Sequence, residues 1–243
     1  MIEVQLSGRL GNNLFQYAVC RSVAERNGFN FYIDPVDWIG NGLIDCDLGV
    51  KDGKITNYFT DVVTQDYNPD IFNVPNFTQL IGCFQTEKYF KRDDVKKWFK
   101  IKHTPNALSF IRAYPPSQWC YVNVRGTDQH TLMLTLSQNY YNKAVNYILQ
   151  FNDELDVLVI TDDIDLGREY FPNAPIFCND RDTDFCILNL GKYVVSAIST
   201  FCWWACYLND ENIVIAPAKW FFCNDAENVW QPRDIRTDKF IWI

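Results

Sequence analysis

Histidine is scarce in this chain, which has only His103 and His130 among its 243 residues. The sequence therefore lacks the side chains for a metal site built on several imidazoles or for a relay of histidine acids and bases, which excludes a zinc hydrolase. The 9 cysteines contain no C-x-x-C pair. Because a chain of this length does not depend on disulfides to fold, we expect reduced, structural thiols.

Basic residues are outnumbered, with 22 Lys and Arg against 30 Asp and Glu and a net charge of −8. No Lys/Arg cluster supplies the basic face that coats nucleic-acid phosphates, so we expect no nucleic-acid partner. No uncharged apolar run approaches the ~18–20 residues that cross a bilayer. The first residues also lack the basic region and apolar run of a signal peptide. We therefore expect a cytoplasmic protein.

Apolar residues are plentiful, at 48% hydrophobic and 16% aromatic, which is enough for a buried core. The first 33 residues predict a strand at 2–6, a glycine-bearing turn, a helix that ends at Gly28 and a strand at 29–33. For residues 34–76 we predict loops. A strand at 78–84 and a single helix over 87–99 follow.

The stretch 102–117 contains three prolines. It includes a short apolar segment but breaks regular structure at both ends, so we place a domain boundary there. Beyond it, strands and helices alternate. We predict strands at 120–124, 156–160, 175–178, 193–196 and 213–216, and helices after Ser137 and over 164–170, 183–191 and 200–208. The pattern predicts an α/β fold with two facing Rossmann-like domains, residues 1–110 and 118–243, and a ligand cleft between them.

Three polar segments lie at predicted strand ends. In Gly8–Gln16 the glycines let a turn approach a ligand, and the next helix offers its first N–H groups to an anion. A purely structural turn is the alternative, since the dinucleotide-binding glycine spacing is absent. In Tyr121–Asp128 a strand leads into Arg125, whose guanidinium is suited to clamping a diphosphate. The alternative for Arg125 is a surface salt bridge.

The third segment is Ser196–Trp204, where Ser199 or Thr200 is placed to cap the next helix while its amides face a phosphate. An ordinary helix cap followed by aromatic core residues is the alternative. Asp162 and Asp163 follow a buried strand without an intervening residue, so they do not form a metal-binding D-x-D motif. For them a capping or nucleoside-binding role is preferred.

Six motifs in the same order, over residues 8–221, resemble those of the α-1,2-fucosyltransferases. Gly8–Ala18 is similar to their G-L-G-N-Q-L-F-Q-Y-A, and Gly82–Phe90 to their G-Y-F-Q-S-E-K-Y-F. The other four are Val122–Asp128 for V-H-x-R-R-G-D, Thr161–Asp163 for S-D-D, Ser199–Trp204 for S-T-F-S-W-W, and Ile215–Phe221 for I-A-P-x-x-W-F.

The resemblance implies a GT-B architecture, GDP-fucose as donor, a glycan acceptor bound on the side of the first domain, inversion at the anomeric carbon, and no metal or other cofactor. It also implies the contacts to the donor. Arg125 would bind the β-phosphate, Ser199 and Thr200 would contact the diphosphate, and Asp162 and Asp163 would lie near the nucleoside. Gly11 and Asn123 are implied as further donor-binding residues, and Asn12 and Gln16 would line the cleft. A fixed cation and oriented amides are suited to the charge that grows on a departing diphosphate.

The chain departs from the family motif around Arg125. Asn123 replaces the histidine and cannot take a proton, and Gly126 replaces the second arginine, which removes a charge-assisted contact worth roughly 1.5–3 kcal/mol. Arg9 is a candidate for compensation. Asp128 is the candidate general base, with the fixing of Arg125 as its alternative role. The sequence thus favours a fucosyltransferase, with transfer of another deoxysugar, or a binding protein without turnover, as the alternative functions.

Overall fold

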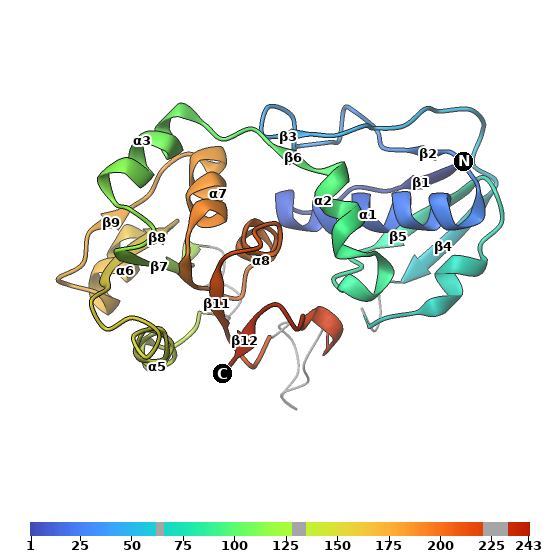
Figure 1. Ribbon diagram of the computed structural model, residues 1–243. Coiled ribbons are helices and arrows are strands. Elements are labelled where there is room, and N and C mark those ends of the chain that lie inside the picture. The colour runs from blue at the N-terminus through green and yellow to red at the C-terminus, as the bar shows by residue number, and fades with distance from the viewer. Residues whose placement is uncertain (62–65, 128–134, 221–232) are drawn as a thin grey trace. The chain divides into compact units, whose positions relative to one another are not determined.

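The computed structural model describes residues 1–61, 66–127, 135–220 and 233–243 (Figure 1). The chain forms two compact units. The first contains Met1–Lys102 and a short C-terminal segment that ends at Thr237. The second begins at His103 and includes the last residues of the chain, Asp238–Ile243.

The first unit is built on a parallel sheet with the strand order β2-β1-β5-β4. The bounds are β1 Ile2–Val4, β2 Phe31–Tyr32, β4 Asn57–Asp61 and β5 Thr78–Gly82. Helix α1, Leu10–Asn27, links β1 to β2 and packs on both (Figure 1). It ends at Gly28, whose φ of 67° is the left-handed conformation that glycine adopts without strain. The predicted opening strand-helix-strand unit is confirmed.

Two expectations for the first unit were wrong. Residues 34–76 contain β3 (Ile44–Asp45), the 3-10 helix η1 (Pro69–Asn73) and β4, which pairs along its whole length with β5. Strand β4 lies at the edge of the sheet, and its residues alternate between half-buried and exposed. It was missed because such a strand carries little apolar signal. The single helix over 87–99 is divided into η2 (Glu87–Tyr89) and α2 (Arg92–Trp98), because Phe90 and Lys91 are extended. After α2, β6 (Lys100–Ile101) pairs antiparallel with β3.

The second unit contains a parallel sheet with the order β12-β11-β10-β7-β8-β9. Its strands are β7 Trp119–Val124, β8 Asp156–Thr161, β9 Ile176–Phe177, β10 Tyr193–Val195, β11 Ile213–Ala216 and β12 Ile241–Trp242. The helices are α3 Pro105–Ala113, α5 Gln138–Ile148, α6 Ile164–Tyr170, α7 Arg181–Leu190 and α8 Thr200–Tyr207; the last short element, η3, is Arg233–Ile235.

The strands and helices predicted beyond residue 118 are confirmed. The proline-rich link holds a regular helix, however, because Pro105 occupies the first turn of α3 after the Thr104 cap, where a missing N–H costs nothing. Strand β12 was not predicted. It pairs with β11 at the edge of the sheet, and no local sequence pattern predicts this pairing.

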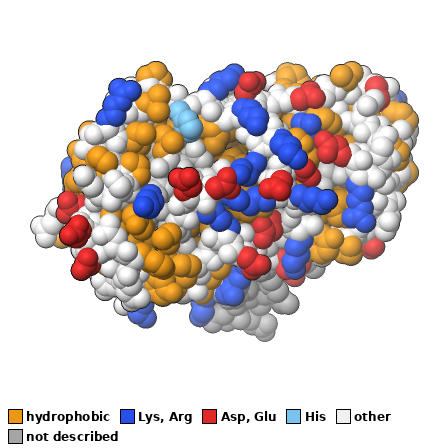
Figure 2. All heavy atoms as spheres, in the orientation of Figure 1, with side chains coloured by type: hydrophobic (Ala, Val, Ile, Leu, Met, Phe, Trp, Pro, Cys, Tyr) orange, Lys and Arg blue, Asp and Glu red, His pale blue; other side chains and the backbone are white. Residues whose placement is uncertain are grey.

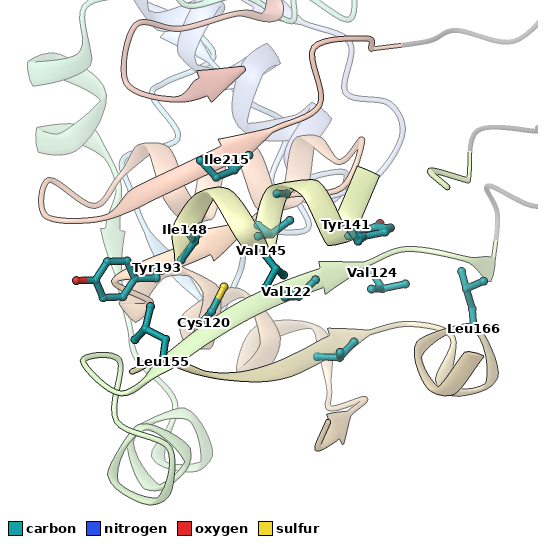
Figure 3. Packing of buried hydrophobic residues seen from close by; sticks show 13 residues of the cluster. Cys120, Val122, Val124, Tyr141, Val145, Ile148, Leu155, Leu166, Tyr193 and Ile215 are labelled. Atoms are coloured by element: carbon teal, nitrogen blue, oxygen red, sulfur yellow. The ribbon is translucent and has the colours of Figure 1, made fainter. Parts of the chain in front are cut away.

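One hydrophobic cluster of the second unit lies between α5 and one face of the sheet (Figure 3). Alternate residues of β7, from Cys120 through Val122 to Val124, point to this face and meet Tyr141, Val145 and Ile148 from one side of α5. Each large side chain buried in this way stabilises the fold by about 1.5–3 kcal/mol. The opposite face is covered in part by α3, where Phe110 packs edge-on against Tyr121.

No disulfide joins cysteines of the described residues, and several of these thiols, such as Cys20 and Cys120, are fully buried. Burial raises the pKa of the Cys120 thiol to about 12, so it stays protonated and behaves as a small hydrophobic group. Of the helices in the described parts of the chain, none has the length and hydropathy to span a bilayer.

Candidate functional site

The sheet of the second unit reverses its winding at β7. From β7 the chain proceeds to β8 and β9 on one side, and then crosses to β10, which pairs with the other side of β7. The carboxyl ends of β7 and β10 therefore flank a topological switch point. In open parallel sheets this is where ligands bind, because the loops diverge there. Two of the three predicted polar segments, Tyr121–Asp128 and Ser196–Trp204, lie at these strand ends.

Arg125 is the first residue after β7, and its side chain reaches both neighbouring strands. Its Nη1 donates to Oγ of Ser199 at 3.3 Å, and its Nε lies 4.0 Å from Oδ2 of Asp162. The side chain is 17% exposed, so most of the guanidinium is held by protein while part of it still meets solvent. A half-buried guanidinium is a stronger anion site than a fully hydrated one, because its field is less screened.

The turn after β7 is held by Asp162, the residue that follows β8. One carboxylate oxygen of Asp162 accepts from the backbone N–H of Gly126 at 2.9 Å, and the other accepts from the hydroxyl of Thr127 at 2.8 Å. Asp163 caps α6, accepting from the N–H of Leu166 at 3.0 Å. The capping alternative for Asp163 is confirmed. Asp162 instead fixes the loop that carries Arg125.

Gly126, which stands at the position of the family's second arginine, is packed against Asp163. A Cβ at Gly126 would lie 2.4 Å from Oδ2 of Asp163 and 2.6 Å from its Cβ. Both approaches are shorter than any ordinary carbon contact. The position of the family's second arginine is therefore taken by a glycine whose backbone lies close against the side chain of Asp163.

Ser199 is the N-cap of α8, as predicted. Its Oγ accepts from the N–H of Cys202 at 3.3 Å while receiving the hydrogen bond from Arg125. Thr200, the first residue of α8, is half-buried. The N-terminus of α8 thus adds the partial positive charge of its backbone N–H groups to the guanidinium.

Asn123 occupies the position of the family's histidine and is 8% exposed. Its Nδ2 donates to the carbonyl oxygen of Ile160 at 3.3 Å. This bond connects the carboxyl ends of β7 and β8. Its Oδ1 has no hydrogen-bond partner among the described residues. The side chain points to the same face as Tyr121, away from the α5 core. Donor contact by Asn123 stays a prediction.

The predicted residues of the first unit lie at the carboxyl ends of β1 and β5. Gln16 is fully buried and donates from Nε2 to Oγ of Ser7 and to the carbonyl of Gly82, each at 2.9 Å, while its Oε1 accepts from the N–H of Ser7. Asn12 accepts at Oδ1 from Gln85 at 2.9 Å. Gln16 therefore ties the loop after β1 to the end of β5. Gly11 is buried in the first turn of α1.

Some predicted positions are not covered. Asp128, the candidate base, lies outside the described residues, as does His130. Arg9, the candidate for compensation, precedes α1 in the first unit and is exposed. A role of Arg9 in binding stays a prediction.

Asp184, in the first turn of α7 beyond the end of β9, is one residue that the sequence analysis missed. Burial raises its pKa to about 6, with the charges of Asp180 and Asp162 adding to the shift and hydrogen bonds from Asn179 opposing it. Oδ1 of Asp184 accepts from Nδ2 of Asn179 at 2.8 Å. A carboxylate in the first helical turn after a strand end was the available signal.

Within the described ranges, no three His, Cys, Asp or Glu side chains group closely enough to hold a metal ion. On the face seen in Figure 2, Lys and Arg side chains are interleaved with Asp and Glu and do not form one basic patch. The charge that a ligand would meet near Arg125 therefore comes from the local arrangement of Arg125, Asp162 and the start of α8.

Two parallel sheets of this kind define an α/β protein of the GT-B class. A solved structure of POFUT1 in complex with GDP has this fold, with a TM-score of 0.51 at 12% identity over 88% of this chain and 97% of that one. The predicted fold class is confirmed.

Two curated proteins of Escherichia coli match in sequence. O-antigen biosynthesis glycosyltransferase WbnK is 31% identical over 103 residues, which are 39% of this chain and 34% of WbnK. An alpha-1,2-colitosyltransferase is 30% identical over 165 residues, 59% of this chain and 56% of that protein. The matched region thus spans about a third of WbnK and a little more than half of the colitosyltransferase. No family profile matches the chain. These two relatives, one of them a colitosyltransferase, confirm the resemblance of the sequence to glycosyltransferases.

Proposed function

We propose that this protein is a glycosyltransferase that moves L-fucose from GDP-fucose to a hydroxyl group of a glycan acceptor, with an α-1,2 linkage and inversion at the anomeric carbon. The observation that carries the proposal is the meeting of Arg125 and Ser199 at the switch point of the second sheet. A half-buried cation beside a helix N-terminus is suited to a diphosphate. The likeness of the sequence to named sugar transferases supports it.

In the proposed reaction, the acceptor oxygen attacks the anomeric carbon and the bond from that carbon to the β-phosphate oxygen breaks. The acceptor proton passes to a carboxylate, for which Asp128 is the candidate, and GDP leaves with the negative charge. Arg125 and the first amides of α8 stabilise that charge as it develops. Asp162 keeps the Arg125 loop in place. We propose that these groups meet the charge without a metal ion, and that the first unit binds the acceptor.

A second candidate is transfer of another deoxysugar on the same scaffold, and the name of the colitosyltransferase relative favours it. The two candidates share the diphosphate site around Arg125 and differ only in the sugar pocket. Competition between nucleotide sugars therefore separates them. The sugar whose GDP derivative supports the larger kcat/KM is the donor.

The test is to incubate the purified protein with GDP-fucose and simple galactosides, with magnesium and with EDTA, and to follow GDP release and product mass. We expect transfer in both conditions. Arg125→Ala should weaken GDP binding about 10- to 100-fold, which is the loss of a charge-assisted contact. Arg112→Ala, which removes an exposed arginine of α3, is the matched control and should bind as the wild type does.

Three results of these experiments would contradict parts of the proposed function. Binding of GDP without transfer or donor hydrolysis for any sugar would favour a protein that binds but does not turn over. Unchanged affinity for GDP in Arg125→Ala would remove the central assignment. Transfer that stops with EDTA and returns with magnesium would contradict the metal-independent route.

A further inference from the structure

We propose that Tyr140 and Tyr141, two consecutive residues of α5, are positioning residues that hold the loops after β7 and β10 at the separation where Arg125 meets Ser199. The inference rests on the proposed function for its meaning in catalysis, since the pair Arg125–Ser199 is the proposed diphosphate site. Both side chains contact the protein backbone behind that site.

Tyr140 holds the loop after β10. Its hydroxyl donates to the carbonyl oxygen of Ser196 at 2.7 Å, and it lies 3.4 Å from the carbonyl oxygen of Ile215. The N–H of Ser196 itself donates to the Ile215 carbonyl at 2.8 Å. The end of β10 is therefore tied both to β11 and to α5, three residues before Ser199.

Tyr141 holds the loop after β7. Its side chain is 1% exposed and belongs to the apolar cluster of the second unit, where Figure 3 shows it beside Val124 at the carboxyl end of β7. Its hydroxyl accepts a hydrogen bond from the backbone N–H of Arg125. Burial raises the pKa of Tyr141 far above its ordinary value, so the hydroxyl stays neutral at every physiological pH.

One rigid element therefore fixes both sides of the switch point. Consecutive side chains of a helix point about 100° apart, so the two hydroxyls reach two neighbouring strand ends and not the same one. The rings of Tyr140 and Tyr141 pack at 5.1 Å and 68°, and the ring of Tyr170 lies 5.7 Å from that of Tyr141. Helix α5 packs on β7, β10 and β11. This packing makes the separation of the two loops a property of the core.

Holding the two loops in place lets Arg125 bind a diphosphate without first rearranging its side chain. A guanidinium that must first find its partner loses binding free energy to ordering, whereas one already aligned does not. The side chain of Arg125 is long and has several rotatable bonds. The alignment of its guanidinium therefore depends on where the Arg125 backbone and Ser199 are held. The tyrosine hydroxyls supply that constraint from behind the site.

The test compares Tyr140→Phe and Tyr141→Phe, each of which removes a hydroxyl and leaves the ring, with Tyr147→Phe on the same helix as the matched control. Tyr147 packs on Phe151 by its ring. GDP binding is measured by calorimetry, and the Nε–H signal of Arg125, assigned by its loss in Arg125→Ala, is followed by NMR without ligand. Melting temperature verifies that each variant folds.

We expect Tyr140→Phe and Tyr141→Phe to bind GDP about 3- to 10-fold more weakly, the loss that one neutral hydrogen bond produces. In the ligand-free protein, the Arg125 signal should broaden or shift in both variants and stay unchanged in Tyr147→Phe. An Arg125 signal that matches the wild type in Tyr141→Phe would overturn the proposal, as would an equal change in Tyr147→Phe.

The two proposals fail in different ways. If the wild type binds no GDP, the proposed function fails, and the ligand-free NMR comparison still decides whether the tyrosines position Arg125. If GDP binds and both variants bind it as well as the wild type does, the positioning proposal fails while the function stands.

Discussion

The guanidinium of Arg125 lies 3.3 Å from the hydroxyl of Ser199, although the two residues are 74 positions apart in the chain. The contact bridges β7 and β10, the neighbouring strands between which the sheet changes its direction of winding. Because Ser199 also caps α8, this one hydroxyl links a cation to a helix N-terminus. Several measurements test what this contact and its surroundings contribute.

Removal of the Ser199 hydroxyl should affect both stability and binding. In Ser199→Ala, α8 loses its cap, which costs about 1 kcal/mol of unfolding free energy. Arg125 also loses a partner, so GDP binding should weaken severalfold. Thr104→Ala is the matched control, because Thr104 caps α3 in the same unit by accepting from the N–H of Ala107. It should reduce stability similarly and leave the affinity for GDP unchanged; equal affinity in both variants would contradict the role of Ser199.

A side chain at Gly126 should destabilise the fold. In Gly126→Ala, the new Cβ meets Asp163 at 2.4 Å, so the loops after β7 and β8 must move apart, at about 1–3 kcal/mol. Urea denaturation measures this loss. Gly167→Ala in α6 is the contrasting control, since its Cβ would lie 3.2 Å from a side-chain carbon of Ile176 and alanine favours a helix. A Gly126→Ala protein as stable as the wild type would show that this approach is not required.

The pH dependence of stability should carry a contribution from Asp184. Its pKa is raised to about 6 in the folded protein, against about 3.9 in an unfolded chain. The folded state therefore holds the proton more tightly, so the stability that Asp184 contributes is complete below about pH 4 and is lost as the pH rises through 6. Asp184→Asn keeps an oxygen for Asn179 and abolishes the titration.

We expect Asp184→Asn to exceed the wild type in unfolding free energy by up to about 2 kcal/mol above pH 7, and to match it near pH 4. Urea denaturation at pH 4, 6 and 7.5 measures the difference. Asp165→Asn is the control, because that side chain is 98% exposed and its substitution should change stability by less than about 0.5 kcal/mol. A difference between Asp184→Asn and the wild type that does not vary with pH would contradict the assignment.

Gln16 should be a structural residue of the first unit. Gln16→Leu keeps most of the volume and leaves the buried carbonyl of Gly82 without its donor, which costs about 1–3 kcal/mol. Gln5→Ala, at an exposed glutamine of the same unit, should be neutral. Denaturant titration distinguishes them. If Gln16→Leu lost GDP binding with no loss of stability, the prediction of a donor contact would be preferred over the structural role.

Local patterns predicted many of the elements because their signals are local. Helix α6 begins at its predicted residue since Asp163 caps it three positions ahead of Leu166, and β8 is an apolar run of the kind found in buried parallel strands. The edge strand β4 and the last strand β12 escaped prediction. Their existence depends on pairing with β5 and β11, and an exposed strand edge leaves little trace in hydropathy.

The candidate site also has features that the sequence predicted and features that it did not. The sequence by itself determined which residue types follow each strand, and so predicted that Arg125, Asp162 and Ser199 would stand at strand ends. Only the tertiary structure decided their partners: Asp162 binds the Gly126 turn, Gln16 faces the protein interior, and Arg125 meets Ser199. The physical reason is that hydropathy and capping act over a few residues, whereas strand order and the close approach of loops are settled when the whole sheet packs against its helices.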